Sequence, residues 1–324
     1  MEVAVSKGYK VFKKEHVDKI PVSIIHYNKE DPLTTTGGVQ SFAKGLNQIF
    51  QSVKFMTPNN LDVKYILNNQ VPVICDNQMV SDIPNDIPVI GFQHGVGAVK
   101  YEVTRSSGHG RLKRAQEKAS KRPNTIWVAC ADWIASKFEN IYGNKTNYVI
   151  YHHINTDVFD GNLENENSRL ILHDARTVHK GSNLLPVIEK AFPDWEFQPL
   201  NCKPEDVPNR MRSARAFIHL SHYEGNSIVC NEAMAMDLPC MFTRVGLMQD
   251  ANRPRDIYLI DTDKAYKDRD GLIKETGIFL ETLHNKNYNP RSWVLNNAIP
   301  LISHKKWKQT MIDFQKLSGW ELLF

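Results

Sequence analysis

The chain has 324 residues and a formal net charge of +4 at pH 7, with 41% hydrophobic and 23% charged residues. This is the composition of a soluble globular protein long enough for two domains, and so mild a charge neither requires nor excludes a nucleic-acid partner. Five scattered cysteines without a CxxC pair argue against a disulfide framework and against a zinc site. Because no apolar leader and no membrane-length apolar run occurs, we expect a cytoplasmic protein.

Short apolar runs recur along the chain, and each is followed by a turn or a helical pattern. The first series of predicted strands lies at 21–28, 71–77, 87–95, 125–131 and 147–154. A second series lies at 168–175, 196–201, 216–225, 238–246 and 257–263. Apolar strands that alternate with helices predict parallel βαβ units. The fold class is therefore α/β, with two Rossmann-like domains that face each other across a cleft.

The polar stretch 160–168 separates the two series and predicts the domain boundary. We expect an N-terminal domain at 1–160 and a C-terminal domain at 161–302. The tail 303–324 predicts an amphipathic helix that packs back on the N-terminal domain through Trp307, Met311, Phe314 and Leu317. Ligands of open α/β sheets bind at the carboxyl ends of the strands, so functional residues should follow strands directly.

Two features of the first domain meet this condition. Gly37 and Gly38 end the loop after the first strand, where backbone amides at a helix start can approach a phosphate; a flexible loop tip is the other interpretation. His94 lies between glycines directly after a strand, as a substrate contact or as a structural histidine.

In the second domain, Arg176 and Lys180 follow the first strand. Two cations at a strand–helix junction suit a diphosphate that gains negative charge as it leaves, although a solvated helix start would look the same. Further on, Asp261 and Asp263 follow the strand 257–263 and suggest either a metal-binding pair or a strand-ending turn.

The stretch 221–246 places two carboxylates, Glu224 and Glu232, around a predicted helix start. Gly225, Asn226 and Ser227 can turn the chain and cap a helix that begins at Ile228. Both carboxylates would then lie near free backbone N–H groups at the positive end of the helix dipole. Such a site can hold an anion on its amides and hydroxyl groups on its carboxylates, and a sugar nucleotide carries both kinds of group.

Taken together, these motifs resemble the GT-B glycosyltransferases of the retaining family 4 type, the glycosyl transferases group 1. The resemblance spans residues 20–260 and includes "TTTGGVQSFAKGL", "TIWVACADWIASKFENIYG", "DARTVHKGSNLL" and the E-x7-E segment "HYEGNSIVCNEAMAMDLPCMFTRVG". The chain departs from the family pattern at "YHHINTDVF", at Cys130 and at Asn226.

The resemblance implies a role for each candidate. Glu224 would face the donor sugar and Glu232 the ribose hydroxyls, while the amides of residues 225–228 would lie along the diphosphate. Arg176 and Lys180 match the diphosphate-binding pair, and Gly38 matches the glycine loop across the cleft. His94 matches a histidine near the reacting sugar.

The resulting hypothesis is a metal-independent, retaining glycosyltransferase that uses a nucleoside-diphosphate sugar, with a UDP-sugar as the favoured donor and no cofactor. Two alternatives stay open: a nucleotide-sugar-binding module without turnover, and a metal-dependent transferase built on Asp261 and Asp263. No stable protein partner is evident.

The acceptor side is suggested by the basic segment 105–124, in which Arg105, Arg111, Lys113 and Arg114 follow His94. These cations predict a polyanionic acceptor, either a phospholipid-linked glycan at an anionic membrane surface or DNA that carries a hydroxylated base. A solvated helix face, with a neutral acceptor, is the other interpretation.

Overall fold

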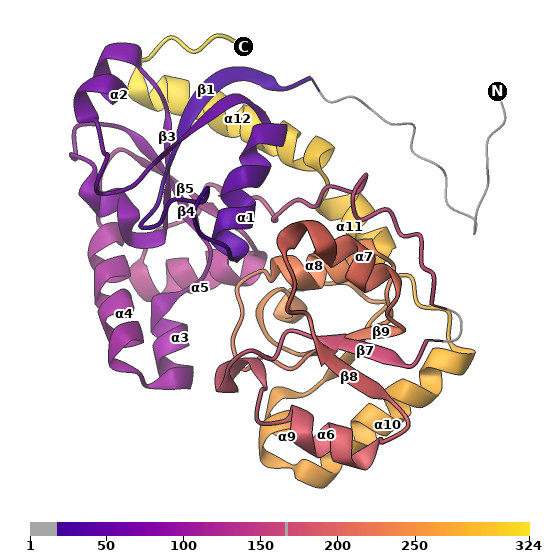
Figure 1. The fold of residues 1–324 in the computed structure, drawn as a ribbon. Coiled ribbons are helices and arrows are strands. Elements are labelled where there is room, and N and C mark those ends of the chain that lie inside the picture. Colours follow the sequence, from indigo (N-terminus) through magenta and orange to yellow (C-terminus); the bar gives the residue numbers. More distant parts are fainter. Residues whose placement is uncertain (1–17, 166–167) are drawn as a thin grey trace, which may run out of the picture.

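The structure, a computed structural model, describes residues 18–165 and 168–324, and in it two parallel sheets are each covered by helices (Figure 1). The first sheet has the strand order β2-β1-β3-β4-β5-β6. Its strands are β1 (Ile20–Tyr27), β2 (Phe50–Met56), β3 (Val73–Asp76), β4 (Val89–Gln93), β5 (Thr125–Ala129) and β6 (Tyr148–Val149).

The second sheet has the order β11-β10-β9-β7-β8. Its strands are β7 (Leu170–His173), β8 (Glu196–Pro199), β9 (Ala216–His219), β10 (Cys240–Thr243) and β11 (Tyr258–Ile260). All ten predicted strands are present, which confirms the two Rossmann-like sets. The strand β2 was not predicted, because only its end residues Phe50 and Met56 are buried and the polar residues between them face outward at the sheet edge.

The helices follow the strands in βα alternation. They are α1 (Gly38–Gly45), α2 (Val63–Asn69), α3 (Gly97–Thr104), α4 (Ser107–Ser120), α5 (Asp132–Tyr142), α6 (Leu185–Ala191), α7 (Val207–Arg212), α8 (Ile228–Ala235), α9 (Thr262–Lys267), α10 (Arg269–Asn285), α11 (Arg291–Asn297) and α12 (Pro300–Ser318). Short 3₁₀ turns complete the connections. The residues 166–167 of the predicted boundary stretch lie outside the described residues, as do residues 1–17.

The last helix, α12, runs from the second domain back along the first (Figure 1). Trp307 is fully buried there, with ring centroids 5.6 Å from Phe50 and 5.8 Å from Phe92. Met311 and Phe314 are also buried, as their spacing predicts. Leu317 is 44% exposed, so the apolar face ends one turn before the helix does.

A helix cap that crosses between the domains holds them together. Ala131 stands at the N-cap of α5 and cannot cap it, and Asp250 of the second domain does so instead. Its two carboxylate oxygens accept hydrogen bonds from the backbone N–H groups of Asp132 (3.0 Å) and Trp133 (2.7 Å). The indole of Trp133 donates in turn to the carbonyl of Gly225 (2.9 Å). Two of the unpaired backbone N–H groups at the start of α5 thus become part of the domain contact.

We predict that Asp250→Ala lowers the free energy of unfolding by about 1–2 kcal/mol, because it removes this cap. It should also enlarge the radius of gyration in X-ray scattering, because the cap joins two domains. The matched control is Asp62→Ala, which removes the cap of α2 within one domain (Asp62 Oδ1 to Tyr65 N, 2.9 Å). The control should lose stability at unchanged dimensions, and equal dimensions in both variants would contradict the prediction.

Candidate active site

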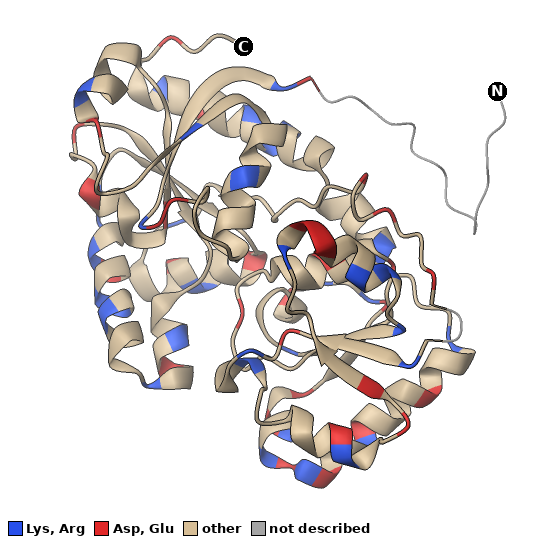
Figure 2. Cartoon of the chain, viewed as in Figure 1, with Lys and Arg blue, Asp and Glu red and all other residues tan. Residues whose placement is uncertain are grey.

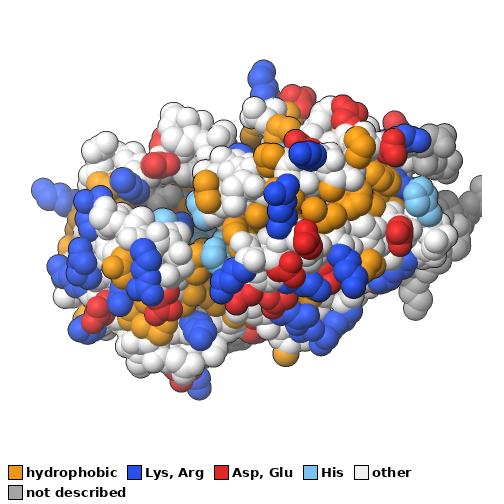
Figure 3. Space-filling model, turned by 90° about the horizontal axis from the view of Figure 1, so that it is seen from below, with side chains coloured by type: hydrophobic (Ala, Val, Ile, Leu, Met, Phe, Trp, Pro, Cys, Tyr) orange, Lys and Arg blue, Asp and Glu red, His pale blue; other side chains and the backbone are white. Residues whose placement is uncertain are grey.

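A cavity of about 470 Å³ lies between the two domains, at the carboxyl ends of both sheets. Seen from below, histidine and basic side chains gather where the two halves of the molecule meet (Figure 3). The residues predicted for the donor site all line this cavity: Gly38, His94, Arg176, Lys180, Glu224, Gly225, Asn226, Ser227, Ile228 and Glu232. The fold therefore brings together candidates that lie far apart in the sequence.

Two helix starts contribute free amides to the cavity. The helix α1 begins after Gly37, whose φ of 156° is rare for residues with a side chain and which offers no side-chain cap. Ser227 occupies the N-cap of α8 as predicted, but its hydroxyl makes no capping bond. The side chain of Asn226 does not cap either, because it donates to the carbonyl of Cys130 in the first domain (2.9 Å). The amides at both helix starts remain available to an anion.

The turn before α8 needs glycine because of the opposite domain. A Cβ atom built on Gly225 would lie 1.9 Å from the carbonyl oxygen of His94, closer than any real contact. A Cβ atom on Gly38 would meet nothing within 4 Å. The two backbones thus touch at Gly225, whereas Gly38 faces open cavity.

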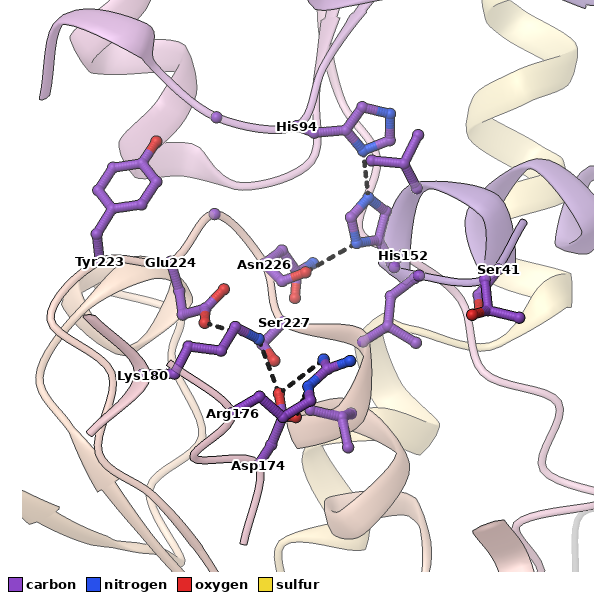
Figure 4. Close-up of a pocket in the computed structure, with 18 of the residues that line it drawn as sticks. Ser41, His94, His152, Asp174, Arg176, Lys180, Tyr223, Glu224, Asn226 and Ser227 are labelled. Atoms are coloured by element: carbon purple, nitrogen blue, oxygen red, sulfur yellow. Dashed lines mark hydrogen bonds and ion pairs between the residues drawn. The ribbon is translucent and has the colours of Figure 1, made fainter. Parts of the chain in front are cut away.

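The predicted cations are held by a carboxylate that sequence reasoning missed. Asp174 is 3% exposed, and its oxygens lie 2.6 Å from Arg176 Nε and 2.7 Å from Lys180 Nζ (Figure 4). Lys180 Nζ also lies 3.6 Å from Glu224 Oε1. Burial alone would lower the pKa of Lys180, but the carboxylates of Glu224 and Asp174 raise it. The position of Asp174 directly after a buried strand could have marked it.

The two carboxylates of the E-x7-E segment differ in charge. Burial would raise the pKa of Glu224, but the hydrogen bond and charge of His219 (3.0 Å) and the charge of Lys180 hold it at about 2. Burial would likewise lower the pKa of His219, and Cys230 and Glu224 raise it to about 10. Glu224 is therefore a carboxylate already paired with a buried imidazolium. Sequence reasoning missed His219, which stands at the end of β9.

Glu232 has the opposite character. Its carboxyl group makes no hydrogen bond or ion pair with any residue that the structure describes, and it lines the cavity. Burial, reinforced by the nearby charge of Asp174, raises its pKa to about 8. Near pH 7 Glu232 is mostly protonated, and its oxygens are free to meet a ligand.

His94 lies in the cavity wall, but both of its ring nitrogens are engaged. Nε2 lies 2.8 Å from Asp76 Oδ1 and Nδ1 lies 3.1 Å from His152 Nε2. Neither partner was singled out from the sequence, although "YHHINTDVF" marks His152 as a departure from the family pattern.

The basic residues predicted for the acceptor side do not line the cavity. Arg111 and Arg114 are exposed on α4, where blue segments follow the helix in Figure 2, and Arg105 and Lys113 lie about the ring of Tyr101 (5.7 and 5.9 Å). The cavity wall on this side is formed instead by other residues of α3 and α4, among them Lys100.

One cation of the basic segment has a structural role. Arg122 is buried, and its guanidinium donates to the carbonyls of Pro84 (2.7 Å) and Ile87 (2.6 Å). The basic segment is thus less of a continuous binding surface than its sequence suggests.

The metal-binding interpretation of Asp261 and Asp263 is not supported. Asp261 caps α9, accepting from the backbone N–H groups of Asp263 (2.9 Å) and Lys264 (3.2 Å). Asp263 pairs with Lys267 at 2.9 Å, and neither aspartate lines the cavity. Within residues 18–165 and 168–324, no group of three or more His, Cys, Asp and Glu side chains could hold a metal ion.

A family model described as "Glycosyl transferases group 1" matches residues 197–274. In structure, sucrose-phosphate synthase from Thermosynechococcus elongatus aligns with a TM-score of 0.68 at 14% identity, over 91% of this chain and 99% of that one. HepE from Anabaena, in complex with UDP and glucose, aligns with a TM-score of 0.67 at 12% identity, over 90% and 100%. The chain has the GT-B fold of these glycosyltransferases, and its residues 197–274 match the group 1 family.

The family match covers the E-x7-E segment and does not reach Arg176 and Lys180. The catalytic domain of starch synthase IV from Arabidopsis thaliana, bound to ADP and acarbose, has a TM-score of 0.57 at 10% identity, over 92% and 99% of the two chains. Comparison with curated proteins gives no significant match. Among the described helices, none has the length and apolar character to cross a membrane.

We predict that Gly225→Ala lowers the free energy of unfolding by about 1–3 kcal/mol and abolishes donor binding, because its methyl group would force the domains apart. Gly38→Ala is the matched control, since it adds the same methyl group to the same cavity without a clash. Urea unfolding and calorimetric titration with a sugar nucleotide measure the two effects. Wild-type stability in the Gly225 variant would contradict the close contact.

Proposed function

We propose that this glycosyltransferase moves a sugar from a nucleoside-diphosphate sugar, with a UDP-sugar as the favoured donor, to an acceptor hydroxyl with retention of configuration. The supporting observation is a single cavity that combines two uncapped helix starts, a cation pair and two carboxylates of different charge. Free amides and cations suit a diphosphate, and carboxylates suit sugar hydroxyls. HepE, which shares the fold, has been solved with UDP-glucose.

In this proposal the chain's residues position the donor and stabilise charge. The acceptor oxygen forms its bond to the anomeric carbon on the face from which the diphosphate leaves. The breaking bond's electron pair goes to the diphosphate, which takes up the acceptor's proton. Lys180 and Arg176 then turn from Asp174 towards the growing negative charge, and Glu224 receives sugar hydroxyls. No step in this scheme uses a metal ion.

Transfer or slow hydrolysis of radiolabelled UDP- and GDP-sugars tests the proposal. Turnover is expected, and Lys180→Ala should lower kcat more than donor affinity, because its charge matters most as the diphosphate separates. Lys190→Ala, on the exposed end of α6, is the control. Tight donor binding without turnover under any acceptor would instead indicate a binding module.

The protonation of Glu232 predicts how donor binding depends on pH. Ribose hydroxyls donate to a carboxylate, so the donor binds the ionised form of Glu232. With a pKa of about 8, this form grows as the pH rises, and donor affinity should rise with it. The apparent Kd at pH 7 should be about tenfold weaker than at pH 9, because only about one molecule in ten is then ionised.

Calorimetric titration with UDP-glucose across this pH range measures the effect. In the Glu232→Gln variant, which has no carboxyl group to titrate, affinity should be weaker and independent of pH. Affinity that falls as the pH rises, or an unchanged slope in the variant, would contradict the role of Glu232.

For the acceptor we propose an anionic molecule. Lys100 supports this, because it lines the cavity from α3 and its ammonium group has no hydrogen bond or ion pair with any described residue, lying 5.9 Å from the centre of the Tyr223 ring. Burial lowers the pKa of Lys100. The exposed Arg111 and Arg114 of α4 add positive charge on the same domain. A cytoplasmic enzyme that meets a phospholipid-linked glycan at a membrane surface, or DNA with a hydroxylated base, fits this charge.

We predict that binding to duplex DNA weakens with salt at a slope near −0.9 per phosphate contacted, whereas binding to anionic vesicles needs the lipid charge. Arg111→Ser with Arg114→Ser should reduce whichever binding occurs, and Lys100→Met should reduce turnover of that acceptor. Lys190→Ser is the control. Absence of both kinds of binding in the wild type would indicate a neutral acceptor.

A further inference from the structure

A chain of polar groups crosses from the first domain to the second along the wall of the cavity. Asp76 ends β3, His94 follows β4, His152 follows β6, and Asn226 precedes α8 of the other domain. Asp76 Oδ1 lies 2.8 Å from His94 Nε2, and His94 Nδ1 lies 3.1 Å from His152 Nε2. His152 Nδ1 lies 2.9 Å from the carbonyl oxygen of Asn226 (Figure 4).

Counting protons along this chain determines its charge. The two end atoms, a carboxylate oxygen and a carbonyl oxygen, both accept hydrogen bonds. Each of the three contacts therefore needs one proton between its atoms. Two neutral imidazoles carry only two ring protons, so one contact would be left with two facing lone pairs. A third proton removes that repulsion, and it makes one of the two histidines an imidazolium.

The surroundings decide which histidine carries the charge. Burial would raise the pKa of Asp76, but His26 and His94 hold it well below its usual range, so Asp76 is ionised. Burial and the neighbouring charge of His94 lower the pKa of His152 to about 3, so His152 is neutral. The extra proton accordingly belongs on His94, between the carboxylate and His152.

The groups that face this chain add no second carboxylate among the described residues. His26 Nε2 lies 3.1 Å from Asp76 Oδ1, and its Nδ1 is buried without a hydrogen-bond partner. The rings of Phe42 and Phe92 lie 5.0 Å and 4.8 Å from the ring of His94. His153 points elsewhere, with Nε2 3.0 Å from the carbonyl oxygen of Gly45.

We propose that His94 is an imidazolium fixed between Asp76 and His152, and that these two are positioning residues for sugar transfer. The proposal of a role in transfer rests on the proposed function; the charge itself does not. Because both ring nitrogens of His94 donate to protein atoms, His94 does not take the acceptor's proton. It acts as a fixed positive charge in the wall of a cavity that receives a doubly charged donor.

The second domain contributes one acceptor to this hydrogen-bonded chain. The carbonyl of Asn226 is the acceptor that demands the third proton, and it reaches His152 only while the domains are in contact. Without it, His152 Nδ1 faces solvent and two protons satisfy the remaining contacts. Formation of the closed cleft and protonation of His94 are therefore coupled.

Nitrogen-15 NMR of the histidine rings tests the charge without any assay of activity. At pH 7 the His94 ring should show two protonated nitrogens and the His152 ring a proton on Nδ1 alone. Asp76→Asn keeps the shape of the side chain and removes its charge, so His94 should become neutral at a lower pH. Two neutral rings in the wild type at pH 7 would overturn the proposal.

The role in transfer is tested by the pH profile of turnover. In the wild type, turnover should fall as the pH rises and His94 loses its proton. Asp76→Asn should move this fall to lower pH and reduce kcat by about tenfold or more at pH 7. His152→Asn should have a similar effect on kcat.

His153→Asn is the matched control, since it removes an adjacent histidine that bonds outside the chain. Its pH profile should equal that of the wild type. If Asp76→Asn leaves the pH profile of turnover unchanged, the positioning role is refuted, even if NMR shows the charge on His94. If the protein transfers no sugar at all, the proposed function fails, and the NMR result still decides the charge of His94. Melting temperatures identify variants that fail to fold.

Discussion

The approach of one backbone to another at Gly225 is the constraint on which the site depends. The turn before α8 lies against the carbonyl of His94 so closely that no side chain fits between them. Hydrogen bonds donated by Trp133 and Asn226, and those accepted by Asp250, surround this contact and join the two domains. The helix start of α8 thereby faces the wall that carries His94. This contact brings the domains together. For that reason the cation pair, the two carboxylates and the histidine chain line one cavity.

Charge in the site is balanced before any ligand arrives. Asp174 holds both Arg176 and Lys180, and His219 holds Glu224, so each of these cavity charges has a counterion. In the proposed function, a donor diphosphate replaces Asp174 as the partner of these two cationic groups. Glu232 stays neutral until hydroxyl groups reach it. Such pairing lets a buried, highly charged site remain folded when it is empty.

Sequence reasoning identified the strands from apolar runs and the donor residues from their place after strands. The structure places Arg176, Glu224 and Gly225 in one cavity, as expected from their positions at strand ends and a helix start, because such local features show in consecutive residues. Sequence reasoning missed β2, whose mostly exposed middle residues hide the strand pattern, and it did not anticipate that one cation of the basic segment is buried. Arg122 shows why: a cation in a charged run can still be buried against backbone carbonyls, and only packing reveals it.

The sequence by itself determined two α/β domains, the order of their strands along the chain and the residues at the strand ends, because these follow from short-range hydrophobic periodicity and turn chemistry. The tertiary structure alone decided which charges meet. Asp76, His94, His152 and Asn226 come from four separate segments and two domains, and they form a hydrogen-bonded chain only in the folded structure. Likewise, the difference between Glu224 and Glu232 arises from a buried histidine beneath one carboxylate and none beneath the other. Burial and ion pairing depend on the three-dimensional arrangement of the residues, which their pattern along the chain does not specify.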